Sequence, residues 1–143
     1  MQLIGILDDS VEVRQSEMTR AIDSLRIAAI TVHHDNARDF IDWLADAWTG
    51  IRLVSLDHDL GPTREREGQR FDPGTGMDVA DFLVSKPPAF PVIVNSSNPM
   101  DSPIMVQRLE SAGWKVRRVI PFMDEWIPTI WLQAVENALD LHS

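Results

Sequence analysis

Apolar and polar residues follow two periodicities along the chain. Short runs rich in β-branched and aliphatic residues predict strands at Gln2–Leu7, Ile27–Val32, Leu53–Leu56, Pro91–Asn95 and Lys115–Ile120. Between these runs, apolar residues recur at helical spacing. We expect helices from the cap Ser10 through Leu25, over Asn36–Trp48 and Met77–Val84, from Ser102 to Gly113, and from the cap Asp124 through Leu139.

Regular alternation of strands and helices predicts an α/β fold with a parallel sheet and helices on both faces, arranged in three layers. We expect residues 1–143 to form a single domain, because no linker, repeat or low-complexity block interrupts the pattern. The segment Gly61–Gly76 is long for a strand-to-helix connection. Its glycines and prolines predict a hinged lid, in which Arg64, Arg66 or Arg70 would contact a bound phosphate, although their interleaving with Glu65 and Glu67 equally suits a solvated loop.

The composition narrows the functional classes. There is no cysteine, which excludes disulfides and thiol catalysis. The net charge of −9 argues against non-specific nucleic-acid binding, which depends on Lys and Arg, but allows one phosphate bound through a metal ion. No apolar run approaches the ~20 residues of a membrane span and no basic leader precedes the first strand, so we expect a soluble cytoplasmic protein without membrane contact.

Acidic and polar residues follow three of the predicted strands. Asp8 and Asp9 follow the first, Asp57-His58-Asp59 the third, and the run Asn95-Ser96-Ser97-Asn98 ends the fourth. In an open parallel sheet, ligands bind beyond the carboxyl ends of the strands. We therefore predict one pocket, in which Asp8, Asp9 and Asp57 hold Mg²⁺ or Mn²⁺ through oxygen ligands. The alternative, that Asp8 and Asp9 only begin a helix, leaves Asp57 unexplained.

The other pocket residues have two interpretations each. His58 suits general acid–base catalysis together with Asp57 and Asp59, but strand alternation equally allows a structural histidine that points away from Asp57. The residues Asn95, Ser96, Ser97 and Asn98 offer hydroxyl, amide and backbone N–H groups to a phosphate, or form an ordinary polar turn.

With these clusters, the chain resembles the receiver domains of response regulators along essentially its whole length. The resemblance implies a flavodoxin-like fold with strand order 2-1-3-4-5 and places Asp57 at the phosphoacceptor position. It also implies that Asp8 or Asp9, Asp57 and the backbone carbonyl of Asp59 hold Mg²⁺, with Ser96 as the hydroxyl that binds a phosphoryl oxygen. Receiver domains carry a lysine before the Pro-Phe step, whereas this chain has Ile120. We therefore expect no stable aspartyl phosphate.

Several strings are similar to those of the cyclic-phosphate-processing receiver domains, namely Leu56–Gly61, Gly76–Ala80, Asn95–Asn98 and Leu109–Trp114. This similarity implies recognition or processing of a cyclic phosphate ester of a nucleotide or RNA end, with a small phosphate-containing ligand and metal-dependent phosphodiesterase chemistry as one option. The alternative is a signalling module, either a phosphoacceptor response regulator at Asp57 or a lysine-free pseudo-receiver that binds a protein partner.

Overall fold

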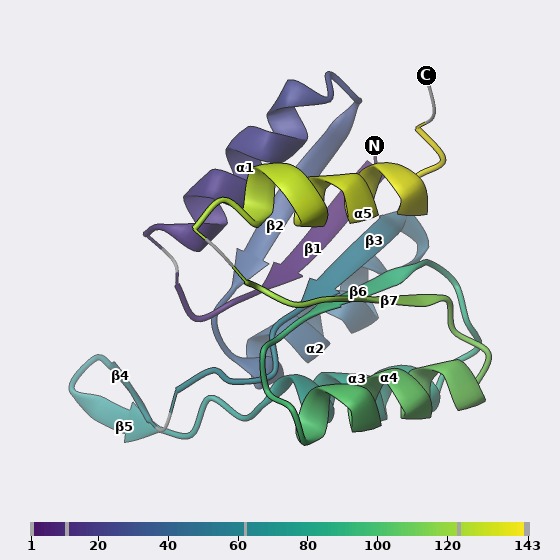
Figure 1. Cartoon of the computed structure of the whole chain (residues 1–143). Helices are drawn as coiled ribbons and strands as arrows, with labels where there is room; N and C mark the ends of the chain where they lie inside the picture. Colours follow the sequence, from purple (N-terminus) through teal and green to yellow (C-terminus); the bar gives the residue numbers. More distant parts are fainter. Residues whose placement is uncertain (1, 11, 62, 123, 142–143) are drawn as a thin grey trace.

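The computed structural model describes residues 2–10, 12–61, 63–122 and 124–141. Five parallel strands form its central sheet in the order β2-β1-β3-β6-β7 (Figure 1). Their bounds are β1 Gln2–Leu7, β2 Ala29–His34, β3 Ile51–Leu56, β6 Val92–Asn95 and β7 Val116–Val119. The expected flavodoxin-like topology is confirmed, because β6 and β7 are the fourth and fifth strands of the sheet.

Helices cover both faces of this sheet and give the expected three layers. Figure 1 shows α1 (Arg14–Ser24) and α5 (Leu132–Ala138) on one face, and α2 (Ala37–Ala47), α3 (Gly76–Val84) and α4 (Asp101–Ser111) on the other. Each face of the sheet has its own apolar core: Met18 and Trp131 lie between the sheet and the helices α1 and α5, whereas Phe40 and Leu83 lie between the sheet and the helices α2, α3 and α4. Among the described residues, no helix is both long and apolar enough to cross a membrane.

Three helix starts differ from the sequence-based expectation. Helix α1 begins at Arg14, with Val13 rather than Ser10 at the N-cap position. The last helix does not begin at Asp124; residues Ile127–Trp131 form a π-helical turn that leads into α5, and Pro128 at its start lacks the N–H needed for an earlier turn. Helix α4 begins at Asp101 rather than Ser102, because Asn98 Oδ1 accepts the N–H groups of Met100 and Asp101 at 3.0 and 2.8 Å.

The segment Gly61–Gly76 contains a β-hairpin in place of an irregular loop. Strands β4 (Arg64–Arg66) and β5 (Gln69–Phe71) pair antiparallel and extend away from the three-layer body (Figure 1). Glu67 and Gly68 both adopt positive φ angles, as a two-residue hairpin turn of the I′ type requires. The guanidinium of Arg66 pairs with Asp39 at 3.0 Å, on α2, and the side chain of Arg64 lies outside the described part.

Candidate functional site

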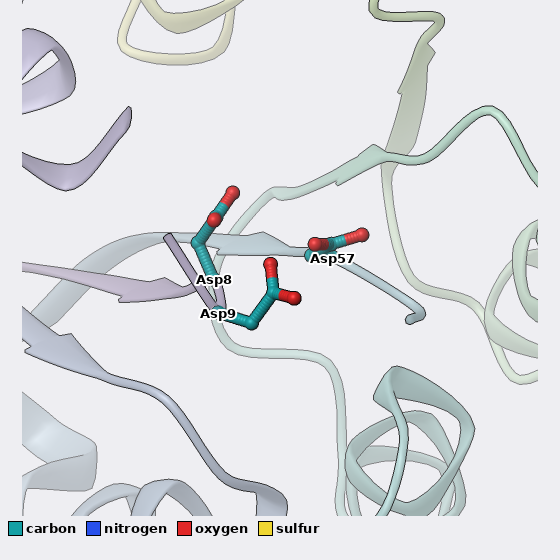
Figure 2. Close-up of side chains that lie close together, drawn as sticks. All are labelled: Asp8, Asp9 and Asp57. Carbon is teal, nitrogen blue, oxygen red and sulfur yellow. The ribbon is translucent and has the colours of Figure 1, made fainter. Parts of the chain in front are cut away.

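Three carboxylates meet at the carboxyl ends of the adjacent strands β1 and β3. Asp8 and Asp9 follow β1, Asp57 follows β3, and one oxygen from each lies within 4.8 Å of the others (Figure 2). The strands bring them together because β1 and β3 are paired, with Leu7 opposite Leu56 and the N–H of Asp57 donating to the Leu7 carbonyl. Asp8 is fully buried and Asp57 nearly so, whereas Asp9 is partly exposed. We call Asp8, Asp9 and Asp57 the acidic triad.

Burial makes this triad costly to ionise without a cation. Desolvation, reinforced by the negative charge of Asp8, raises the pKa of Asp57 from 3.8 to about 8. Burial also raises the pKa of Asp8, against the lowering effects of the Ser10 N–H and the Arg14 guanidinium. Carboxylates that resist ionisation in this way gain strongly from a bound divalent cation, which supplies the missing positive charge.

Arg14 provides a positive charge at the triad, and the sequence analysis missed it. Its Nε lies 3.0 Å from Asp8 Oδ1, and its Nη2 lies 2.6 Å from Asp9 Oδ1 and 3.9 Å from Asp57 Oδ2. The signal was present in the sequence, because Arg14 opens the helix that follows the acidic pair and therefore faces it. The guanidinium acts as a built-in counter-ion for the three acids.

The donor set of the triad fits a hard divalent cation. Asp8 Oδ2 is buried and has no hydrogen-bond partner among the described residues, so it is available as a ligand. Together with oxygens of Asp9 and Asp57 it gives the carboxylate set that Mg²⁺ and Mn²⁺ prefer. Gln15 holds the backbone of Asp8 in place, since its buried Nε2 donates to the carbonyls of Asp8 and His34 at 2.8 and 3.1 Å.

A second cluster surrounds His58, next to the triad in sequence. The imidazole is buried, with Nδ1 2.8 Å from Asp59 Oδ1 and Nε2 3.6 Å from Asp101 Oδ2. Both ring nitrogens therefore face carboxylates, of which Asp59 is the more exposed, with 64% of its side chain accessible against 44% for Asp101. Asp101, which the sequence analysis missed, comes from the first turn of α4.

The run Asn95–Asn98 divides between structural and accessible groups. Asn95 is buried, and its Oδ1 accepts from Ser55 Oγ at 2.5 Å, so its oxygen is used inside the sheet. Ser96 is also buried, and its Oγ accepts the Asn98 N–H at 3.1 Å. Asn98 Nδ2 approaches Asp59 Oδ1 at 3.4 Å, which joins this loop to the His58 cluster. Ser97 is exposed.

The start of α3 packs against the backbone of the site. Gly76 N–H donates to the His58 carbonyl at 3.0 Å, and an isolated antiparallel bridge pairs Asp59 with Thr75. A Cβ added to Gly76 would lie 2.3 Å from the carbonyl oxygen of Asp57, so only glycine allows this approach. Thr75 and Asp78 form a capping box that fixes the helix start at this point.

Comparisons with known proteins identify the family and the fold. A family model described as "Cyclic-phosphate processing Receiver domain" matches residues 6–111. No curated protein matches the sequence.

Solved structures with the same fold include several response-regulator domains. The signal receiver domain of a LuxO repressor protein from Vibrio parahaemolyticus has a TM-score of 0.70 at 14% identity, covering 98% of this chain and 91% of its own. A receiver domain from Rhodospirillum rubrum gives 0.67 at 14%, covering 99% and 95%. A CheX–CheY–BeF3–Mg complex from Borrelia burgdorferi gives 0.63 at 18%, covering 95% and 87%. At these identities the likeness concerns the fold.

Proposed function

Because this chain belongs to the cyclic-phosphate processing receiver domain family, we propose that its acidic triad holds Mg²⁺ or Mn²⁺ and that the surrounding pocket recognises or hydrolyses a cyclic phosphate ester of a nucleotide or RNA end. The observation that carries the proposal is the convergence of Asp8, Asp9 and Asp57 within 4.8 Å, with the pKa of Asp57 raised to about 8. Such a triad requires a cation to ionise fully, and a cation there would attract an anionic ligand.

A cyclic phosphodiester suits an acidic protein of this kind. It carries one negative charge, so a single metal ion can bind it without an extensive basic surface. When bound, the metal would act as a Lewis acid toward the phosphoryl oxygens. The loop Ser96–Asn98 would supply further contacts to the phosphate ester, since Ser97 is exposed and Asn98 lies at the edge of the His58 cluster.

Hydrolysis of a 2′,3′-cyclic phosphodiester needs one water molecule and no other reactant. The water oxygen bonds to phosphorus, one ring P–O bond breaks, and the released ribose oxygen takes up a proton. Asp57 or Asp59 would accept the proton of the attacking water. The His58–Asp59 pair would return a proton to the leaving oxygen through its exposed member, Asp59, because the ring nitrogens of His58 both face carboxylates.

The test is hydrolysis of 2′,3′-cyclic mononucleotides and of ADP-ribose cyclic phosphate with Mg²⁺ or Mn²⁺, alongside binding by calorimetry. If His58 carries the proton relay, His58→Ala should lower the rate by ~10²–10⁴-fold while cyclic nucleotide binding persists. Binding without turnover would make the protein a sensor of such esters. The absence of both binding and turnover would refute the proposal.

One feature supports a second candidate, a signalling module. Asp57 directly follows the central strand β3, and the resemblance to receiver domains would place the phosphoacceptor there. Ile120, which is 46% exposed and stands where receiver domains carry their lysine, argues against a stable phosphorylated state. Intact-mass analysis after acetyl-phosphate treatment distinguishes the two: a lasting phosphoryl adduct on Asp57 together with a change of oligomeric state would favour the signalling module.

A further inference from the structure

Arg118 is a cation close to the loop Ser96–Asn98 of the site. It lies outside residues 6–111, the range that the family model matches. It lies on β7, where its register partner is Val94, the residue before Asn95 on β6. Its Nη2 lies 3.5 Å from the Oγ of Ser102, in the first turn of α4. The side chain therefore points to the α4 face of the sheet and toward the carboxyl end of β6.

Ser102 connects this guanidinium to the loop. Its Oγ is fully buried, donates to the carbonyl of Asn98, and lies 3.5 Å from the carbonyl of Ser96. Arg118, Ser102 and the backbone of residues 96–98 thus form one contiguous hydrogen-bonded group. A charge on Arg118 acts on the loop at short range, in surroundings that screen it less than water does.

The charge of Arg118 is not balanced within the described part of the chain. No carboxylate pairs with it there, and its Nε is buried with no hydrogen-bond partner. The positive guanidinium also lies beside the start of α4, where the helix dipole is positive, an unfavourable arrangement that a neighbouring anion would relieve. Asp101 is the acidic residue of this first turn, but it faces His58 and Asn98.

We propose that Arg118 is an electrostatic determinant of phosphate recognition in this pocket, in addition to the metal ion at the acidic triad. Arg118 supplies a positive charge next to the Ser96–Asn98 loop, which Ile120 does not supply. The inference rests on the proposed function, and it makes Arg118 a positioning residue that acts through the loop. Its contribution should grow with the negative charge of the ligand, which a purely structural arginine would not produce.

The experiment compares two anions in the presence of Mg²⁺: inorganic phosphate, mostly doubly charged at pH 8, and singly charged 2′,3′-cyclic AMP. Arg118→Met removes the charge, Arg118→Gln removes the charge but retains a hydrogen-bond donor for Ser102, and Arg118→Lys retains the charge. We expect the Met and Gln variants to bind cyclic AMP roughly 10-fold and phosphate roughly 100-fold more weakly than the wild type. The Lys variant should keep close to wild-type affinity for both anions.

Arg117→Met is the matched control, because Arg117 is the exposed neighbour on the other side of the same strand. Mg²⁺ affinity without an anion, measured for each variant, shows whether the acidic triad is intact. Equal losses for the two anions, or wild-type affinity in both Met and Gln variants, would overturn the inference while leaving the proposed function standing. Absence of Mg²⁺-dependent binding of both anions by the wild type would remove both.

Discussion

Replacing Asp57 with asparagine tests the electrostatics of the acidic triad directly. Asparagine resembles the protonated carboxyl in shape and carries no charge. In the wild type, burial and the charge of Asp8 raise the pKa of Asp57 to about 8, so in the metal-free protein this side chain holds its proton at neutral pH. In the unfolded chain it would ionise near 3.8. Folding at neutral pH must therefore take up a proton.

The sign and size of the effect follow from linkage. Below about pH 4 both states of the wild type are protonated, and there is no penalty. From there to about pH 8 the unfolded state alone is ionised, so the metal-free wild type loses stability as the pH rises. The interval from 3.8 to 7, at 1.36 kcal/mol per pH unit, corresponds to on the order of 4 kcal/mol at pH 7. Asp57→Asn should recover most of this.

The assay is urea denaturation in EDTA at pH 5 and pH 7, with Asp46→Asn, an exposed aspartate on α2, as the control. The stability difference between Asp57→Asn and wild type should widen from pH 5 to pH 7. Mg²⁺ should then stabilise the wild type more than the variant, and its binding to the wild type at pH 7 should release close to one proton. A pH-independent difference, or unchanged Mg²⁺ affinity in Asp57→Asn, would refute the reasoning.

Two further substitutions test neighbouring parts of the site. Arg14→Met removes the cation that competes with Mg²⁺ at the triad, so Mg²⁺ should bind roughly tenfold more tightly in calorimetry, and the metal-free protein should be less stable at pH 8. Arg20→Met, exposed on the same helix, is the control, and weaker Mg²⁺ binding by Arg14→Met would contradict the competition. Gly76→Ala should cost about 1–3 kcal/mol in urea denaturation and weaken Mg²⁺ binding, because the added Cβ would press on the Asp57 carbonyl; full stability with normal Mg²⁺ affinity would contradict this account.

The parallel sheet and the meeting of Asp8, Asp9 and Asp57 could be predicted from the sequence. Both depend on local signals: apolar runs mark the strands, and the residue after each strand lies at a known edge. The resemblance to receiver domains supplied the order of the strands. Residues 64–71 were not predicted as a hairpin because their charged sequence lacks the apolar alternation that marks a half-buried strand.

The contacts of individual side chains could not be predicted, because they depend on how distant segments pack. Asn95 was expected to face a ligand, yet its oxygen binds Ser55, 40 residues away in sequence, which in turn accepts the indole N–H of Trp131 at 3.0 Å. Asp101 reaches His58 only because Asn98 sets where α4 begins. Neither arrangement has a signature in residue spacing.

The bridge between Asp59 and Thr75 has a consequence for how this chain can diversify. Because the two positions pair directly, the two ends of the intervening segment lie side by side at the body of the protein. Its length can then vary at little cost, since each doubling of a flexible loop adds only about 0.6 kcal/mol of closure entropy. Insertions or deletions there would leave the triad and the sheet in place, so the β4–β5 hairpin is a segment whose length this fold can change without rebuilding the site.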